Sequence, residues 1–351
     1  MVKNISVLKK GRLSLAVDLG IDLGTTKIII DRPGKGVVLD EPSVVAYNIR
    51  SGEVVAVGHE ALRMMGRAPD YIQIECPVRE GVISNHEFTE FLIREFVRKV
   101  SGGFFSRPRV AICIPSAITR VEARAVVEAA LSAGARKVYL IDEPIAAAIG
   151  AGIDVIKPVG RMMVDLGGGT TDIAVISMGG IIVSASLKIA GNIFDEAIVR
   201  YIENTYKLAI GTTVGEQLKK EIGCVWNPQV GVTATIRGRN LITGIPEEVT
   251  VTQNELCEIL APQAEEIVSG VRQVLAKTPP ELAGDILTEG ILMTGGTAQL
   301  RGLAEMIEDA TGIRTRVADD PVSCVGIGTG KCFELIGELK EGFELASGGR
   351  S

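Results

Sequence analysis

The chain has 351 residues, 46% of them hydrophobic and 23% charged, which favours a globular protein of two domains. Its net charge of −6, without a long Lys/Arg run, gives no indication of a nucleic-acid partner. Two histidines and six scattered cysteines argue against a histidine-based metal site, a Ser-His-Asp triad and a disulfide framework, and the apolar runs are shorter than the ~20 residues of a membrane span.

The first predicted elements form a β-hairpin. LAVDLGID, residues 15–22, reads as a strand, LGTT as a turn and KIIID, residues 27–31, as the returning strand. After the turn RPGKG, the segment VVLDEPSVVAY predicts further strand over 37–47. Because the apolar start of the chain runs directly into this hairpin, we do not expect a cleaved signal peptide.

Strands and helices then alternate. RVAICIPS, residues 109–116, predicts a strand, and the helix predicted over 119–134 begins with Thr119 and Glu122 spaced as a capping box and ends at Gly134. KVYLID, residues 137–142, predicts the next strand, and EPIAAAIGAG opens another helix.

The same order begins again at residue 161. RMMVDL predicts a strand, GGGTT a turn, DIAVIS and IIVSASLKIA two strands, and NIFDEAIVRYIENTY a helix. Further on, EGILMTGG, AQLRGLAEMIEDATG, RTRVA and DDPVSCVGIGTGKCFELIG predict strand, helix, strand and helix. We therefore interpret the chain as an internally duplicated α/β unit.

Two stretches do not fit the duplicated unit, and we interpret both as small insertions. The second contains a predicted helix, TVGEQLKKEIG, and an alternating strand pattern over 231–252. The predicted organisation is a tail over 1–12, domain I over 13–153 with 324–340 and an insertion at about 50–86, domain II over 154–323 with an insertion at about 194–252, and a disordered tail over 341–351.

The repeated hairpin places Asp22 and Asp165 in the same context, GIDLGTT and VDLGGGTTD. Glycine lets backbone N–H groups approach a phosphate, threonine adds hydroxyl donors, and a carboxylate at a strand end can hold hydrated Mg²⁺. Two such hairpins facing each other would clamp a triphosphate from both sides. One copy alone would indicate only a tight turn, and the chain has no P-loop motif.

These segments together resemble the actin-like ATPase superfamily and, within it, the MreB-type bacterial actins. GIDLGTT and VDLGGGTTDIAV are similar to its two phosphate segments, IDEPIAAAIGAG and DDPVSCVGIGTGKCFE to its two connecting segments, and GEQLKKEIG and ILMTGGTAQLRGL to its ribose/adenine and adenosine segments. The resemblance covers about residues 18–336. It implies a duplicated α/β fold of two domains, each with a hairpin-containing mixed sheet flanked by helices and a small inserted subdomain.

The resemblance also implies roles for individual residues in binding ATP and Mg²⁺. Asp22 and Asp165 would position Mg²⁺ through water. Glu143 and Thr170 would activate and orient the attacking water of a slow ATPase coupled to polymerisation. The nucleotide would contact Thr25, Thr26, Lys27, Gly167, Gly168, Gly169, Thr170, Glu216, Gln217, Leu218, Lys219, Gly295, Gly296, Thr297 and Ala298.

Some of these residues have a simpler interpretation. Glu143 precedes a proline and can serve only to stabilise a helix start. Glu216 and Lys219 lie one helical turn apart and can belong to a solvated face. Thr26 and Lys27 replace a common Ala-Asn pair of MreB sequences, and Thr297 replaces a glycine, so a variant that binds nucleotide but barely hydrolyses it remains open.

The segment SGGFFSRPRV places Phe104 and Phe105 in a polar loop near two arginines. Such rings can bury in the protein, or they can dip into a bilayer while the arginines meet anionic headgroups. Because MreB-like proteins bind membranes, the resemblance favours contact with the inner face of the cytoplasmic membrane. It also implies homopolymeric filaments and the cell-wall elongation machinery as a partner.

The favoured interpretation is a cytoplasmic, membrane-associated filament protein that organises cell shape and cell-wall synthesis. A chaperone-type ATPase would carry a peptide-binding domain, whereas only residues 337–351 follow the core. A sugar-kinase-like enzyme would need a second-substrate pocket with its own aspartate, which the sequence does not identify. The remaining alternative is a non-polymerising or weakly hydrolysing actin-like nucleotide switch.

Overall fold

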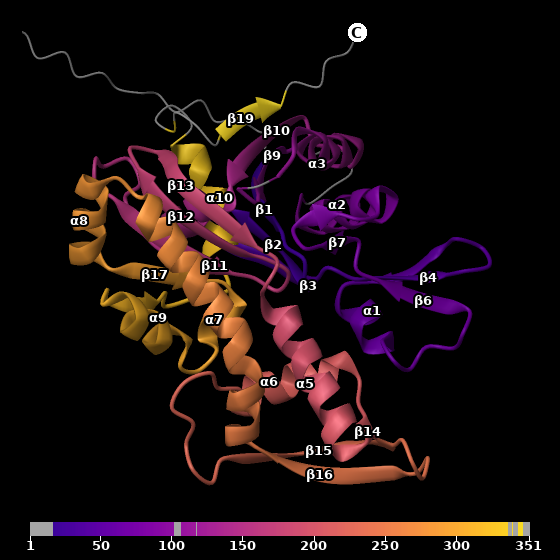
Figure 1. Ribbon diagram of the computed structural model, residues 1–351. Coiled ribbons are helices and arrows are strands. Elements are labelled where there is room, and N and C mark those ends of the chain that lie inside the picture. Colours follow the sequence, from indigo (N-terminus) through magenta and orange to yellow (C-terminus); the bar gives the residue numbers. More distant parts are fainter. Residues whose placement is uncertain (1–16, 102–106, 117, 336–338, 340–342, 347–351) are drawn as a thin grey trace, which may run out of the picture.

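The computed structural model describes residues 17–101, 107–116, 118–335, 339 and, for the backbone alone, 343–346. Two large sheets lie next to each other, the one from the N-terminal half in indigo and purple and the other in pink and orange (Figure 1). Smaller sheets lie further out, around β4 and β6 on one side and β15 and β16 at the base of the view.

The first large sheet has six strands in the order β19-β10-β9-β1-β2-β3. Strands β1, β9 and β10 run parallel, whereas β2 and β3 continue from β1 as antiparallel hairpins. Its strands are β1 (Asp18–Leu23), β2 (Lys27–Arg32), β3 (Gly36–Pro42), β9 (Arg109–Ile114), β10 (Lys137–Asp142) and β19 (Phe343–Ala346), and helices α2 (His86–Ser101) and α3 (Arg120–Ser132) pack on one face.

The second large sheet has five strands in the order β13-β12-β11-β17-β18. Here too an antiparallel hairpin pair, β12 and β13, continues from a strand that has a parallel neighbour on its other side. Its strands are β11 (Arg161–Leu166), β12 (Thr171–Ser177), β13 (Gly180–Leu187), β17 (Ile291–Thr294) and β18 (Thr315–Val317), with helices α7 (Gln253–Lys277), α8 (Pro280–Glu289) and α9 (Leu303–Thr311) against it.

Alternate residues of the central strands point into different cores, because successive side chains of a strand face opposite sides. On β9, Ile112 joins the core of the first half and Cys113 a core shared between the two sheets. On β12, Val175 joins the core of the second half and Ala174 the shared core. This alternation buries both faces of each sheet and joins the two halves through one apolar layer.

Helices α4 (Glu143–Gly150) and α10 (Cys324–Lys331) fill the shared core. They cross so closely that a Cβ at Gly328 would lie 1.7 Å from the carbonyl oxygen of Ala146. A Cβ at Gly150 would likewise lie 1.8 Å from the carbonyl oxygen of Cys324. Only glycine permits this approach, which brings the start of α4 to the gap between the two sheets.

The predicted insertions form small sheets with helices of their own. The first contains the strands β5 (Val54–Val57) and β6 (Ile72–Glu75), which both pair with β4 (Val45–Asn48), and the helix α1 (His59–Met64) between them in the chain. It ends with the hairpin of β7 (Val78–Arg79) and β8 (Val82–Ile83). The second contains α5 (Gly191–Tyr206), β14 (Leu208–Ala209), α6 (Thr212–Ile222), β15 (Thr233–Asn240) and β16 (Pro246–Thr252).

The structure contains helices that the sequence analysis did not assign, α2 and α8 among them, and it differs from the expectation in three further elements. The helix predicted from residue 298 begins only at Leu303, because a 3₁₀ turn over Gly296–Gln299 and a left-handed Gly302, with φ of 86°, interrupt it. The sequence analysis assigned no element to 253–277, which is the long helix α7. The tail predicted to be disordered over 341–351 instead contains β19, whose pairing with β10 satisfies a sheet edge.

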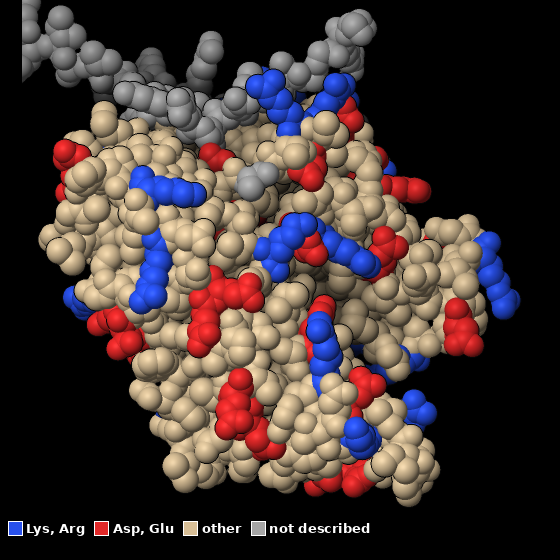
Figure 2. Space-filling model, viewed as in Figure 1, with Lys and Arg blue, Asp and Glu red and all other residues tan. Residues whose placement is uncertain are grey.

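The surface charge and the character of the helices bear on possible partners. Figure 2 shows basic and acidic side chains interspersed on the face in view, which forms no large patch of one sign. Among the residues described, no helix combines the length and the apolar character that a bilayer span needs.

Candidate functional site

The duplicated hairpins bring the two predicted aspartates to equivalent positions. Asp22 near the end of β1 lies opposite Ile29 of β2, and Asp165 near the end of β11 lies opposite Asp172 of β12. By strand alternation both aspartates share the face that Cys113 and Ala174 line, toward the space between the sheets. The sequence-predicted pair therefore faces one common gap.

Burial dominates the electrostatics of this pair. Asp165 is only 6% exposed, and burial raises the pKa of its carboxyl to about 7 although the Thr294 hydroxyl donates to it at 2.6 Å. Burial also raises the pKa of Asp22 to about 6, while the Cys113 thiol donates to that carboxylate at 3.3 Å. Repulsion from Asp22 also raises the pKa of Asp165, and both aspartates raise the pKa of Glu143. A cation in the gap would therefore favour the ionised forms of the two aspartates.

Glu143 opens α4 at the edge of the same gap and is 9% exposed. Burial raises the pKa of its carboxyl well above the usual range, and repulsion from Asp172, Asp165 and Asp22 raises it further. Its position at the N-terminus of α4 agrees with a role in stabilising the helix start. The carboxylates around it, however, are those of the two hairpins. A positive charge in the gap would oppose this rise of the Glu143 pKa and favour the ionised carboxylate.

Asp172 is a member of this cluster that the sequence analysis missed. It is 1% exposed, and the Ser116 hydroxyl, which follows β9 of the first sheet, donates to it at 3.0 Å. Burial raises the pKa of Asp172, and the hydroxyl bond opposes that rise. The sequence signal that could have found Asp172 is its place in the second hairpin, because the first hairpin has the apolar Ile29 at the equivalent position.

The two Gly/Thr turns meet across the gap. A Cβ at Gly168 would lie 1.7 Å from the Thr26 hydroxyl oxygen, and one at Gly169 would lie 2.6 Å from that of Thr25. The hydroxyl of Thr25 also accepts a bond of 3.1 Å from the backbone N–H of Gly81, in the turn of the β7–β8 hairpin. The turns face each other as the duplicated motif predicts, and a side chain at Gly168 or Gly169 would force the facing threonine to move.

A second group of predicted residues gathers around the start of α5. The Thr297 hydroxyl donates to the carbonyl of Gly167 at 2.8 Å, and the backbone N–H of Gly191 donates to the same carbonyl at 3.1 Å. Lys219 donates to the carbonyl of Gly191 at 2.8 Å and pairs with Asp195 at 2.8 Å. Burial raises the pKa of Asp195 to about 6 even though Lys219 lowers it.

Other predicted contact residues lie apart from this group or are engaged elsewhere. Leu218 and Ala298 are buried in the core of the second half, so their side chains are not available to a ligand. Gln217 is exposed, Glu216 pairs with Lys220 at 2.6 Å, and Lys27 pairs with Asp40 at 2.7 Å. The remaining glycines differ: Gly295 is pressed against the Leu166 carbonyl, whereas Gly296 has open space around it and Gly167 has only the Thr170 carbonyl nearby.

These contacts do not test two of the predicted sites, the Mg²⁺ site and the membrane loop. In the part of the chain that the structure describes, no group of three or more His, Cys, Asp or Glu side chains is arranged to ligate a metal directly. Contact of Asp22 and Asp165 with Mg²⁺ through water therefore stays a prediction. Phe104 and Phe105 lie outside the described residues.

Comparison with known proteins identifies close relatives. A family model described as MreB/Mbl protein matches residues 16–341. The chain is 46% identical to the cell shape-determining protein Mbl of Bacillus subtilis over 92% of this chain and 98% of that protein. It is 45% identical to the cell shape-determining protein MreB of Escherichia coli K12 over 94% of this chain and 97% of that protein.

Solved structures show the same fold. Crystal structures of MreB5 of Spiroplasma citri, bound to ADP and to AMPPNP, match with a TM-score of 0.87 and 35% identity over 92% of this chain and 97% of theirs. The MamK double helical filament matches with a TM-score of 0.76 at 22% identity over 91% of this chain and 99% of that one. The likeness to MamK concerns the fold alone.

Proposed function

The chain belongs to the MreB/Mbl family of actin-like proteins, and from this premise we propose that it is an ATP-dependent, filament-forming cytoskeletal protein of the cytoplasm that organises cell shape and cell-wall synthesis. The observation that carries the proposal is the pair of matched hairpins whose aspartates, Asp22 and Asp165, face one gap between the two halves. A fold that only supported filament contacts would have no need to place two carboxyls with raised pKa values at equivalent positions of a duplicated unit.

The ligand proposed for the gap is an adenine nucleotide with Mg²⁺. The ADP and AMPPNP of the solved MreB5 structures support an adenine nucleotide. The buried, mutually repelling carboxylates of Asp22 and Asp165 fit a hydrated divalent cation, which prefers few carboxylates together with water and phosphate oxygens. Thr25, Thr26 and the Gly167–Gly169 turn would contact the phosphates, and Thr297 and Lys219 would lie on the nucleoside side.

Slow hydrolysis is assigned to Glu143 and Thr170. A carboxyl with a raised pKa is a stronger base once it has lost its proton, and the pKa of Glu143 is raised by burial and, further, by repulsion from the neighbouring carboxylates. Mg²⁺ would supply charge neutralisation in the gap. Thr170 would orient the attacking water, and Asp172 would hold the Ser116 side of the gap through its hydroxyl bond.

Membrane association and partners complete the proposal. Phe104 and Phe105 are the proposed contact with the inner face of the cytoplasmic membrane, with nearby arginines meeting anionic headgroups. Self-association is proposed as a head-to-tail contact that does not close and therefore grows into a filament. The names of the curated relatives, cell shape-determining proteins, support a role beside the cell-wall elongation machinery.

Electron microscopy of the full chain with Mg-ATP on an anionic lipid monolayer, beside a lipid-free grid, tests the proposal. We expect filaments on lipid, and few after both Phe104 and Phe105 are replaced by serine. Phosphate release should accompany assembly and fall roughly 100-fold in Glu143→Gln, which loses the proposed base. Glu128→Gln, an exposed change on α3, is the matched control and should leave release unchanged.

Three outcomes would count against the proposal. Monodisperse particles on both grids, from protein shown to bind ATP, would favour the non-polymerising nucleotide switch. Filaments without phosphate release would favour the weakly hydrolysing variant, which the Thr26, Lys27 and Thr297 departures keep open. Unchanged lipid binding in the double serine variant would remove the phenylalanines from the membrane contact.

A further inference from the structure

Three charged side chains lie on one face of the first sheet, beside the turn proposed to hold the phosphates. In strand register Asp22 of β1 lies opposite Ile29 of β2, and Ile29 lies opposite Asp40 of β3. Lys27 precedes Ile29 by two residues in β2 and shares its face, because alternate side chains of a strand point the same way. Asp22, Lys27 and Asp40 therefore all stand on the face of the sheet that turns toward the gap.

Lys27 is bound to Asp40 in the structure. Its ammonium donates to both carboxylate oxygens of Asp40, at 2.8 and 2.7 Å. The two side chains are 34% and 49% exposed, and an ion pair so open to solvent contributes little to stability. By contrast, the pair of Lys219 and Asp195 is only 11% and 12% exposed, and Lys219 also donates to a backbone carbonyl. Of these two lysines, Lys27 is the one that can leave its carboxylate at low cost.

Both members of this exposed pair act electrostatically on the gap. Lys27 lowers the pKa of Asp22, and Asp40 raises it. Lys27 also follows directly on Thr26, whose hydroxyl oxygen would lie 1.7 Å from a Cβ at Gly168 in the facing turn. Phosphates held between these two turns would therefore lie beside Lys27, among carboxylates that would otherwise repel them.

We propose that Lys27 and Asp40 form an exchangeable pair that supplies a counter-ion to the nucleotide. This inference rests on the proposed function, because it takes the ligand of the gap to be an adenine nucleotide. Without nucleotide, Asp40 holds the Lys27 ammonium. When the phosphates enter, the ammonium turns from Asp40 to their oxygens, since lysine is a flexible point charge with three donors and a polyphosphate offers it more negative charge than one carboxylate. Lys27 then carries part of the charge neutralisation that would otherwise fall to Mg²⁺.

Binding of the fluorescent nucleotide mant-ATP to the full chain, in EDTA and with Mg²⁺, tests this inference. Lys27→Met should weaken binding in EDTA by roughly tenfold or more, as expected for a lost charge-assisted hydrogen bond, and by less with Mg²⁺. Lys27→Arg keeps the charge and should recover most of the affinity. Lys35→Met, an exposed change in the turn between β2 and β3, is the matched control for net charge and should bind as the wild type does.

A double-mutant cycle then tests the exchange itself. Asp40→Asn removes the carboxylate that competes for Lys27, and it should tighten binding in EDTA by roughly threefold. The same substitution in the Lys27→Met background removes only repulsion, so its gain should be smaller. Because the side chains of Lys27 and Asp40 are partly exposed, each variant is expected to fold, and circular dichroism verifies this.

Three results would overturn the inference. Binding by Lys27→Met that equals the wild type in EDTA would show that its ammonium does not reach the phosphates. A gain from Asp40→Asn that is as large without Lys27 as with it would show that Asp40 acts by repulsion alone. A loss of affinity in Lys35→Met equal to that in Lys27→Met would assign the effect to net charge. In all three cases the wild-type chain still binds mant-ATP, whereas failure of the proposed function would abolish that binding in both buffers.

Discussion

Asp165 illustrates how a single residue sets the properties of the site. The Thr294 hydroxyl donates to its carboxyl, and its charged neighbours are carboxylates, so burial governs its pKa of about 7. The unfolded chain would lose this proton near the ordinary value of 3.8. Folding therefore binds a proton between these two values, and the free energy of unfolding falls as the pH rises through that window.

We predict that Asp165→Asn stabilises the nucleotide-free protein at pH 8 by about 2–4 kcal/mol, because it removes a buried carboxyl whose pKa is raised from 3.8 to about 7. The amide oxygen can still accept from Thr294. The gain should shrink as the pH falls from 7 toward 3.8, and it should vanish only below 3.8, where the wild-type carboxyl is protonated in both states. Thermal unfolding in EDTA at pH 4.5, 6.5 and 8 measures it, and a gain that does not depend on pH would contradict the assigned cause.

At the scale of the element, α7 shows how a local signal fixes a helix start. Thr252 and Glu255 form a capping box, in which the Glu255 carboxylate accepts from the Thr252 backbone N–H at 2.7 Å. The hydroxyls of Tyr201 and Tyr206 add bonds of 2.8 and 2.5 Å. Despite some desolvation, these donors lower the pKa of Glu255 to about 2.

Glu255→Gln is expected to lower the free energy of unfolding at pH 7 by roughly 1–2 kcal/mol, because the amide accepts weaker bonds from the tyrosines than the carboxylate does. A carboxyl with a lowered pKa stabilises the fold above its unfolded value of 4.5, and this contribution is lost as the pH falls toward 2. Urea unfolding at pH 7 and pH 4 should show the difference shrinking.

Glu122→Gln is the matched control for this change, since α3 begins with the same capping box but without tyrosine donors. Its cost should stay below about 1 kcal/mol because its partner Thr119 is exposed. Equal costs at both positions would show that the tyrosines add nothing to the cap.

For the whole molecule, the crossing of α4 and α10 joins the two halves. Helix α4 contacts strands of both sheets, and α10 packs on the first sheet after the chain has completed the second. The glycine contacts bring these helices to backbone distance. Any side chain at the crossing must push the halves apart, and this would alter the gap that holds Asp22 and Asp165.

Gly328→Ala should therefore destabilise the protein by about 2 kcal/mol or more, since its Cβ would lie 1.7 Å from the Ala146 carbonyl oxygen. Differential scanning calorimetry should show a lower midpoint and separate transitions for the two halves. Gly284→Ala serves as the control because a Cβ there meets nothing within 4 Å, and in helix α8 it should stabilise by about 0.4–1 kcal/mol. A single unshifted transition in Gly328→Ala would refute the joining role of the crossing.

Sequence patterns predicted the local elements well where the signal was strong. The capping box at Thr119 and Glu122 and the strands around Asp22 and Asp165 are as predicted. The break before α9 was missed because it depends on Gly302 fitting against Trp226, a contact between residues distant in the sequence. Helix α7 was not assigned, although its capping box and its buried apolar residues at helical spacing were visible in the sequence.

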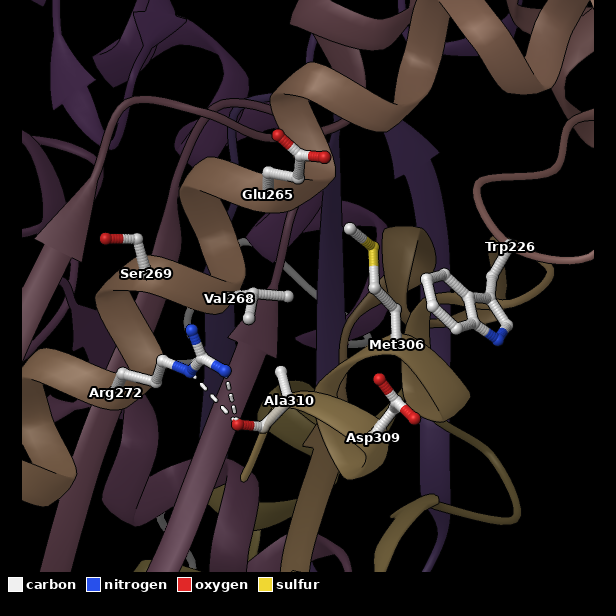
Figure 3. Close-up of a pocket in the computed structure, with 8 residues that line it drawn as sticks. All are labelled: Trp226, Glu265, Val268, Ser269, Arg272, Met306, Asp309 and Ala310. Atoms are coloured by element: carbon white, nitrogen blue, oxygen red, sulfur yellow. Dashed lines mark hydrogen bonds between the residues drawn. The ribbon is translucent and has the colours of Figure 1, made fainter. Parts of the chain in front are cut away.

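By itself, the sequence determined the duplication, the fold class and the pair of aspartates, because repeated motifs and alternating apolar residues are local properties of the chain. Only the tertiary structure decided which side chains share the gap. Asp172 joins Glu143 there through strand register, whereas Leu218 is turned into a core by the phase of its helix. The hollow between α7, α9 and Trp226 likewise exists only because packing brings together two helices and a loop that lie far apart in the sequence (Figure 3).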